Sequence, residues 1–166
     1  MIRDDVQEKA LDVAISNKRC GLGMSMGIGK TRIGLQHMIR NYNPMVSYLV
    51  VAPKKSIFKS WDQEMVKTNN EKMGKHITYT TYLSINKHNP NDFDVVYLDE
   101  CHSLLLGHEA FLAPFTGKIL GLTGTPPVRR GTDKYFMVNK YCPIKYTFSV
   151  DDASDNKILN QYQIII

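Results

Sequence analysis

Two short segments of the sequence carry residue types that suit phosphate chemistry. The first, at residues 26–32, combines two glycines with a lysine and a threonine. Successive backbone N–H groups of such a loop can surround phosphate oxygens, and glycine lets the backbone approach them closely. Lys30 can reach the β- and γ-phosphates, and the Thr31 hydroxyl can hold Mg²⁺. The residues predicted to bind the nucleotide here are Met26, Gly27, Ile28, Gly29, Lys30, Thr31 and Arg32.

This loop departs at one position from the strict GxxxxGK[ST] pattern, because Met24 stands where the first glycine would be. Some families of phosphate-binding loops do not need that glycine, so the departure narrows the choice of family. Gly21, Gly23 and Gly27 also form a GxGxxxG pattern, which would suit a dinucleotide-binding fold. That fold needs an acidic residue at the end of the next strand, but the segment at residues 52–55 is basic. The dinucleotide interpretation is therefore the weaker one.

The second segment is the acidic pair Asp99 and Glu100, which directly follows an apolar run. Two adjacent carboxylates at the end of a buried strand are costly unless something pairs with them. Mg²⁺ bound to a nucleotide would be such a partner, held by Asp99 together with Thr31. Glu100 would then orient or deprotonate the attacking water. We therefore expect Lys30, Asp99 and Glu100 to be catalytic; the alternative for the acidic pair is a solvated turn.

The elements around these segments are expected to alternate between helix and strand. Helical periodicity covers residues 2–17, 30–40, 56–66 and 134–140. Strands are expected at residues 20–26, 46–52, 76–81, 93–98 and 117–123. Strands that alternate with helices and are apolar throughout indicate a parallel sheet covered on both faces, in which ligands bind beyond the carboxyl ends of the strands. The phosphate loop, the acidic pair and the turn at residues 123–125 should therefore converge on one edge.

Length and composition limit the classes of protein that fit. The chain has 166 residues, 43% of them hydrophobic and 22% charged, which suits one globular domain. No apolar run reaches the roughly 18 residues of a membrane span, so no membrane partner is expected. Three widely spaced cysteines without a CxxC pair indicate neither a disulfide framework nor a zinc site, and they favour a reducing, cytoplasmic compartment. The net charge of +5, with its basic excess in the first half, is compatible with a polyanionic partner.

Taken in order, these segments resemble the motifs of the first RecA-like domain of superfamily 2 helicases and translocases. Residues 24–31 resemble motif I, whose first position is often not glycine, and the Asp-Glu-Cys-His of residues 99–102 resembles motif II in its DExH form. The Thr-Gly-Thr-Pro of residues 123–126 resembles motif III of the group that contains Swi/Snf-type translocases and phage recombination helicases. The resemblance implies an α/β fold of the RecA-like P-loop NTPase class over residues 1–145, with a mostly parallel central sheet and helices on both faces. Residues 146–166 would then be a tail or the start of a linker.

Weaker matches extend the resemblance beyond these three motifs. Gln7 is placed like the glutamine that reads adenine, and His102, Thr123 and Thr125 would couple the nucleotide site to the rest of the motor. The loops after two of the expected strands resemble motifs Ia and Ib, which would contact a nucleic-acid backbone. Basic groups beside a helix N-terminus suit phosphates, and solvated lysines are the alternative. The expected nucleic-acid contacts are Lys54, Lys55, Ser56 and Thr81, whereas Trp61 is assigned to the core.

The function that the resemblance implies is the motor lobe of an ATP-dependent helicase or translocase. Its cofactors would be ATP and Mg²⁺, and its partner a nucleic acid, DNA rather than RNA. Helicases of this superfamily close ATP between two RecA-like lobes, and the second lobe supplies an arginine finger. We therefore expect one lobe alone to hydrolyse ATP weakly or not at all, and a second lobe to act in cis or in trans.

A different class of function also fits the sequence. A stand-alone nucleotide-binding regulator or inhibitor would carry a single helicase-like lobe, and coding sequence beyond Ile166 would favour the motor instead. A GTPase is disfavoured because the sequence contains no guanine-reading Asn-Lys-x-Asp element. The short segment before Gln7 would suit a compact phage or viral protein. The expected location is the cytoplasm, which would be the host cytoplasm for a viral protein, or the nucleus for a eukaryotic one.

Overall fold

The computed structural model describes residues 2–25 and 28–149. Within these residues six strands form one sheet, in the order β3-β2-β4-β5-β1-β6, and all neighbouring strands are parallel. The strands are β1 (Arg19–Met24), β2 (Tyr48–Ala52), β3 (Ile77–Thr81), β4 (Val95–Asp99), β5 (Lys118–Thr123) and β6 (Ile144–Phe148). The α-helices are α1 (Ile2–Ser16), α2 (Lys30–Arg40), α3 (Phe58–Lys67), α4 (Glu109–Leu112) and α5 (Asp133–Tyr141). Short 3₁₀ helices in the connections are η1 (Lys55–Ile57), η2 (Glu71–His76), η3 (Ile85–Lys87), η4 (Pro90–Asp92), η5 (Cys101–Ser103) and η6 (Leu106–His108).

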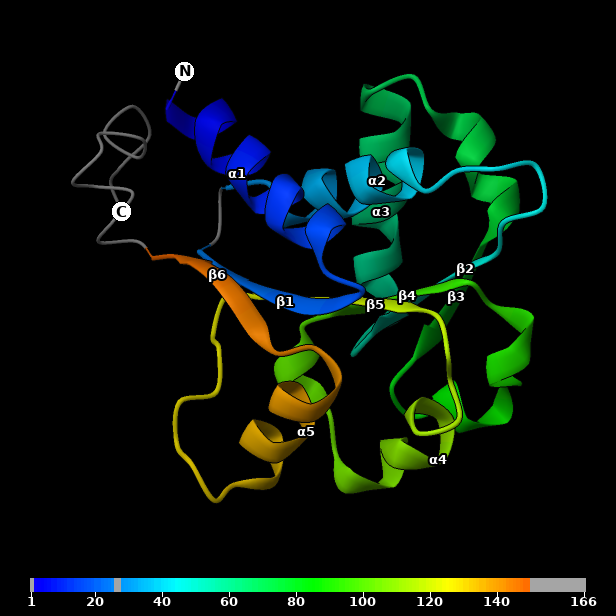
Figure 1. The fold of residues 1–166 in the computed structure, drawn as a ribbon. Helices are drawn as coiled ribbons and strands as arrows, with labels where there is room; N and C mark the ends of the chain where they lie inside the picture. The colour runs from blue at the N-terminus through cyan, green and yellow to red at the C-terminus, as the bar shows by residue number, and fades with distance from the viewer. Residues whose placement is uncertain (1, 26–27, 150–166) are drawn as a thin grey trace.

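Helices cover both faces of the sheet, as predicted. Figure 1 shows α1, α2 and α3 on one face and α4 and α5 on the other. One buried cluster lies between the sheet and the helices α1, α2 and α3, and it includes Tyr48, Trp61 and Tyr97. A second cluster, which includes Leu98 and Phe111, lies on the opposite face of the sheet. The predicted α/β architecture is therefore confirmed, with a sheet that is parallel throughout the described residues.

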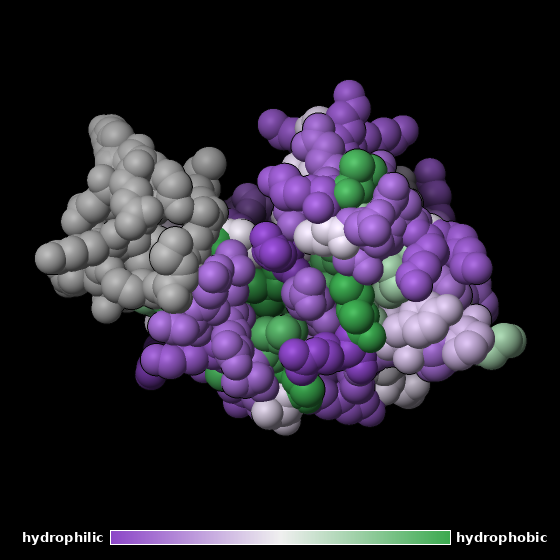
Figure 2. Space-filling view, turned by 90° about the horizontal axis from the view of Figure 1, so that it is seen from above, coloured by the Kyte–Doolittle hydropathy of each residue, from purple (hydrophilic) through white to green (hydrophobic). Residues whose placement is uncertain are grey.

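The inner strands are buried along their whole length. Every residue of β2 and of β4 is buried, which explains why both read as continuous apolar runs in the sequence. Outside the sheet, the surface over α1, α2 and α3 is largely hydrophilic, with small hydrophobic groups between the helices (Figure 2). None of the described helices is both long enough and apolar enough to cross a membrane.

Strand β6 corrects the predicted end of the domain. The boundary expected between residues 145 and 146 falls inside β6, which pairs with β1 through Gly21–Ile144 and Gly23–Thr147. The sheet therefore continues to Phe148, beyond the expected boundary. The strand was missed because it lies at the edge of the sheet, where half-buried and exposed residues alternate and no apolar run marks it. The tail or linker expected from residue 150 onward lies outside the described residues.

Candidate nucleotide-binding site

Three neighbouring strands bring the motif segments to one edge of the sheet. The order β4-β5-β1 places the ends of these strands side by side, and the register pairs Asp99 with Leu122 and Gly23 with Thr123. Because all three strands are parallel, their carboxyl ends meet at the same edge. The predicted convergence of the phosphate loop, the acidic pair and the threonine turn is therefore what the fold produces.

The phosphate loop ends at Gly29, whose backbone is left-handed with φ 89° and ψ 48°. A side chain there would also be blocked, because an added Cβ would lie 2.5 Å from Nε2 of Gln7. That same Nε2 donates a hydrogen bond to the Ile28 carbonyl oxygen at 2.5 Å. Gln7 on α1 therefore contacts the loop directly. Met26 and Gly27 lie outside the described residues.

Lys30, the first residue of α2, extends from this loop toward the acidic pair. Its Nζ lies 4.0 Å from Oε1 of Glu100. A Cβ added to Gly124 would lie 3.1 Å from the same Nζ, so the lysine also approaches the turn after β5. Thr31 is half-buried and Arg32 exposed in the first turn of α2. The helix N-terminus and the Lys30 charge make this a favourable place for an anion.

Asp99 ends β4 with a buried carboxylate that is 6% exposed. Burial raises its pKa, the hydrogen bond from Trp61 opposes that rise, and the neighbouring Glu100 charge adds to it. Trp61 Nε1 donates to Asp99 Oδ2 at 2.9 Å, and the Tyr82 hydroxyl donates to the Asp99 backbone oxygen at 2.8 Å. The carboxylate is therefore held by the indole N–H of α3, the backbone oxygen of the same residue is held by Tyr82, and the residue has only a small opening to solvent.

Glu100 adopts a conformation that is unusual for its residue type. Its backbone is left-handed, with φ 55° and ψ 53°, and it caps the 3₁₀ helix η5. Its side chain is 34% exposed and lies between the Lys30 ammonium and His102, whose Nε2 is 3.8 Å from Oε2. Such backbone strain is often found at functional sites.

His102 connects the acidic segment to the turn after β5. Its Nδ1 is hydrogen-bonded to Oγ1 of Thr123 at 2.7 Å and lies 3.2 Å from Oγ1 of Thr125. The Thr125 N–H donates to Thr123 Oγ1 at 3.0 Å, which closes the turn. Burial lowers the pKa of His102, and the Glu100 charge opposes this effect. The two threonine hydroxyls thus contact the histidine that follows the acidic pair.

Trp61 and Tyr82 contribute contacts that sequence reasoning missed. Trp61 is fully buried, as expected for a core residue, but its indole N–H also binds Asp99. A buried tryptophan usually finds an acceptor for that N–H, and a buried carboxylate needs donors. Both needs are visible in the sequence, but only the fold shows that these two residues meet.

The residues expected to contact nucleic acid lie at the same edge, beyond β2 and β3. Lys54, Lys55 and Ser56 are exposed in the turn and 3₁₀ helix that follow β2. Thr81 ends β3 and is paired in register with Ala52, the last residue of β2. The structure therefore brings this set together at two adjacent strand ends, on the side of β4 away from the phosphate loop.

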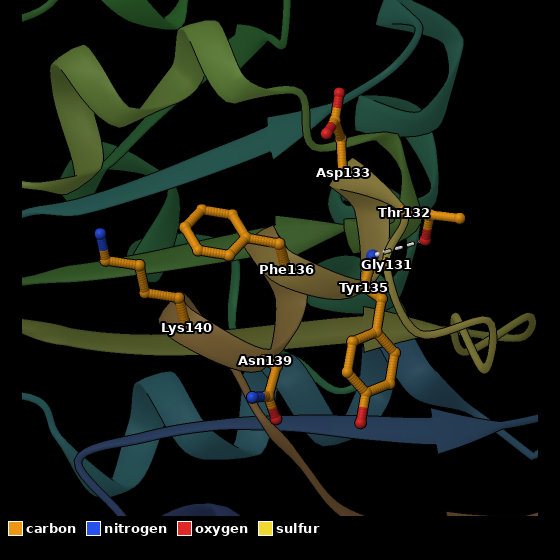
Figure 3. Close-up of a pocket in the computed structure, with 7 residues that line it drawn as sticks. All are labelled: Gly131, Thr132, Asp133, Tyr135, Phe136, Asn139 and Lys140. Atoms are coloured by element: carbon orange, nitrogen blue, oxygen red, sulfur yellow. Dashed lines mark hydrogen bonds between the residues drawn. The ribbon is translucent and has the colours of Figure 1, made fainter.

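Some of the surface pockets lie near the motif residues, and others lie away from them. A groove between α1 and α2 is lined by Gln7 and Arg32, two of the residues predicted to bind nucleotide. A separate pocket is formed by α5 and the turn before it, where Thr132 caps the helix by accepting the Tyr135 N–H (Figure 3). None of the predicted site residues lines this second pocket, so we do not assign it to the motif chemistry.

Sequence comparison places the chain in a family. The family described as "Type III restriction enzyme, res subunit" matches residues 2–128. The chain belongs to this family. None of the curated proteins compared has a significantly similar sequence.

Several solved structures resemble this family member in fold. The Hef helicase domain of Pyrococcus furiosus matches with a TM-score of 0.67 at 15% identity, over 90% of this chain and 39% of the other. UvsW of T4 matches with a TM-score of 0.69 at 15% identity, over 85% of this chain and 33% of UvsW. The SWI2/SNF2 ATPase core of Sulfolobus solfataricus, solved with double-stranded DNA, matches with a TM-score of 0.57 at 17% identity, over 80% of this chain and 34% of the other.

These neighbours confirm the RecA-like α/β fold that the motifs predicted. The chain spans between about a third and two fifths of the length of these structures. At such low identity the likeness concerns the fold, whereas the roles of individual residues depend on the geometry described above.

Proposed function

We propose that this res-subunit family member is the ATP-binding lobe of an ATP-dependent motor that moves on nucleic acid. The observation that carries the proposal is the approach of Lys30 Nζ to Glu100 Oε1, at 4.0 Å across the strand-end edge. A cation from the phosphate loop there faces the acidic pair of β4. This is the arrangement that phosphoryl transfer needs, with positive charge for the phosphates and a carboxylate for water.

The residues present fit ATP with Mg²⁺. Mg²⁺ is usually held by one or two carboxylates together with phosphate oxygens and water, and Asp99 with Thr31 would supply the chain's ligands. Asp99 suits this role because its carboxylate is buried and is oriented by the Trp61 N–H, and within residues 2–25 and 28–149 no cation forms an ion pair with it. The bound metal would supply positive charge that neutralises the phosphate oxygens. The nucleotide loop would comprise residues 26–32.

The chain's own residues would then divide the work. Lys30 would bind phosphate oxygens, and Glu100 would orient the attacking water and take its proton. Gln7, on the groove between α1 and α2, would accept a hydrogen bond from adenine with its amide oxygen, since its Nε2 already donates to Ile28. His102, Thr123 and Thr125 would couple the acidic segment to the turn after β5, because they form one hydrogen-bonded group.

Nucleic acid would contact the loops after β2 and β3, through Lys54, Lys55, Ser56 and Thr81. Two similar structures support DNA as the partner, because one was solved with double-stranded DNA and the type ISP restriction-modification enzyme LlaGI with a DNA substrate mimic. A second RecA-like lobe, in cis or in trans, would complete the site with an arginine finger. Hydrolysis by one lobe alone would therefore be weak.

Two substitutions test the ATP site. Lys30→Ala should weaken binding of a fluorescent ATP analogue by roughly 10- to 100-fold, because a charge-assisted hydrogen bond contributes about 1.5–3 kcal/mol. Lys72→Ala, at an exposed lysine of η2, is the matched control and should bind normally. Glu100→Gln should retain binding and lose hydrolysis by roughly 10²- to 10⁴-fold, the usual contribution of a general base.

The readouts are fluorescence anisotropy for binding and phosphate release for turnover, measured on the full-length protein. Unchanged affinity in Lys30→Ala would exclude the phosphate-loop assignment, and normal turnover in Glu100→Gln would exclude the proposed base. Turnover measured with single-stranded and double-stranded DNA and RNA tests the partner. We expect DNA to stimulate most, and lack of stimulation by any of these nucleic acids would contradict a motor.

A further inference from the structure

Trp61 on α3 contacts both halves of the candidate nucleotide site. Its indole N–H donates to Asp99 Oδ2 at 2.9 Å. The opposite edge of the ring lies against α2, because a Cβ added to Gly34 would be 2.5 Å from Cη2 and 3.0 Å from Cζ3. The Tyr97 ring, on β4, has its centroid 5.9 Å from that of the indole. Trp61 therefore fills the space between the helix that begins at Lys30 and the strand that ends at Asp99.

The hydrogen bond determines how the Asp99 carboxylate is presented. An indole N–H is a donor only. Because Trp61 is fully buried, its N–H cannot turn away from Asp99 to bind water instead. A carboxylate has about four acceptor sites, so a fixed donor at Oδ2 restricts the orientation of the Asp99 carboxylate.

The packing against α2 has a second effect. Thr31 lies in the first turn of α2, one turn before Gly34, so the ring that presses on Gly34 also sets how far α2 lies from β4. A larger residue at Gly34 would collide with the indole. The same side chain thus fixes the orientation of Asp99 and the separation of the elements that carry Asp99 and Thr31.

We propose that Trp61 is a positioning residue for the metal-binding carboxylate, which it orients through its indole N–H and spaces from Thr31 through its contact with α2. The inference rests on the proposed function, since it needs Asp99 and Thr31 to hold the metal of a bound nucleotide. Groups that orient a metal ligand typically change metal affinity by roughly 10- to 100-fold when removed. A tryptophan that only filled the core would change stability and leave the metal dependence as it was.

Trp61→Phe in the full-length protein tests this role, because it keeps an aromatic ring and removes the donor. Binding of a fluorescent ATP analogue is titrated against Mg²⁺, and unfolding is followed separately. The Mg²⁺ concentration for half-maximal binding should rise roughly 10-fold or more, while binding in EDTA stays near that of the unmodified protein. An unchanged Mg²⁺ dependence in a folded variant would overturn the proposal.

Tyr79→Phe is the matched control. The Tyr79 hydroxyl donates to Oδ1 of Asp62 on α3 at 2.7 Å, so this variant also removes an aromatic donor to a carboxylate beside the same helix, but away from the site. Its Mg²⁺ dependence should be unchanged. If the unmodified protein bound no nucleotide, the proposed function and this inference would both fail; if it bound nucleotide and Trp61→Phe had no effect, only this inference would fail.

The 166 residues contain a single tryptophan. A replacement of this side chain that keeps its shape therefore provides a second test. Incorporation of 3-benzothienylalanine for tryptophan replaces the indole N–H by sulfur, and it should raise the Mg²⁺ requirement as Trp61→Phe does. In the unmodified protein, adding Mg²⁺ to the nucleotide complex should shift Trp61 emission, and Asp99→Asn should abolish that shift. An emission that ignores Mg²⁺ while nucleotide is bound would contradict the proposal.

Discussion

Glu100 holds the proposed catalytic carboxylate on a strained backbone. Among the described residues, Asn69 and Glu100 are the non-glycine residues with positive φ. Asparagine tolerates this conformation, but a residue with a longer side chain pays about 1–2 kcal/mol for it. Its carboxylate lies between Lys30 and His102 and next to the buried Asp99, whose charge repels it. The left-handed backbone at Glu100 therefore lowers the stability of the fold but places the carboxylate between Lys30 and His102.

This strain predicts that Glu100→Gly stabilises the fold while it removes hydrolysis. Glycine adopts positive φ without cost, although it adds freedom to the unfolded chain. The free energy of unfolding should rise by about 0.5–1 kcal/mol, measured by chemical denaturation. Asn69→Gly is the control: its stability should change less, and its turnover should be normal. A loss of stability in Glu100→Gly would show that the contacts of Glu100 outweigh its strain.

At this scale the sequence predicts residue types better than it predicts partners. Lys30, Asp99 and Glu100 are recognisable because their chemistry lies in contiguous segments. The bond between Trp61 and Asp99 joins residues 38 positions apart, and many buried donors and acceptors in the sequence have the same need for a partner. The choice among them is made by the packing of α3 on β4, which local sequence does not encode.

The contact between α2 and α3 depends on the absence of a side chain at Gly34. Glycine inside a helix costs about 1 kcal/mol relative to alanine, yet Gly34 lies in the middle of α2 and is buried. The indole of Trp61 occupies the place that a Cβ would take, at 2.5 Å. The two helices thus approach each other closely at the cost of helix propensity, and this close approach also brings Trp61 within reach of Asp99.

We therefore expect Gly34→Ala to destabilise the protein, against its helix propensity. Overpacking of a well-packed core typically costs about 1–3 kcal/mol. Alanine gains about 1 kcal/mol over glycine from helix propensity, so the upper part of the overpacking range exceeds this gain. The control is Gly107→Ala, since nothing lies within 4 Å of a Cβ added there. Chemical denaturation gives the stabilities, and Trp61 emission reports the displaced ring. Greater stability in Gly34→Ala would mean that Trp61 moves aside freely.

Inner and edge elements differ in how well the sequence reveals them. The strands β2 and β4 are buried at every residue, so their apolar runs identify them. In β6 half-buried and exposed positions alternate, and its assignment depends on pairing with β1, far away in the sequence. Helix α2 begins and ends where the sequence predicts, at Lys30 and Arg40, because glycine precedes it and a break at residues 41–44 follows it.

At the scale of the whole molecule, we expect the stability of the fold in acid to depend on a histidine that is buried between α2 and the sheet. His37 of α2 is 2% exposed, and its Nδ1 is hydrogen-bonded to the hydroxyl of Tyr97 at 2.7 Å. Burial, with the Lys118 charge adding to it, lowers the pKa of His37 from 6.5 to about 4, and a hydrogen bond from the imidazole to the Ala14 backbone opposes this effect. His37 therefore stays neutral in the folded state at a pH where the unfolded chain is protonated.

The sign of the effect follows from proton binding. Between pH 6.5 and about 4 the unfolded state binds more protons at this position than the folded state, so the free energy of unfolding falls as the pH falls. A shift of this size corresponds to about 3 kcal/mol, since one pKa unit is about 1.4 kcal/mol. Asp99 acts in the opposite direction, because its raised pKa means that acid protonates the folded state first.

The two contributions are separated by comparing variants rather than by a single pH profile. His37→Gln removes the titrating group and should flatten the loss of stability between pH 6.5 and 4, measured as urea unfolding at each pH. His88→Gln, outside the buried core, should keep the profile of the unmodified protein. His37→Gln also disturbs the hydrogen bond to Tyr97, so the variant will be less stable at neutral pH. The test is therefore the slope of the free energy of unfolding against pH. Parallel profiles for His37→Gln and the unmodified protein would show that His37 is protonated within the fold.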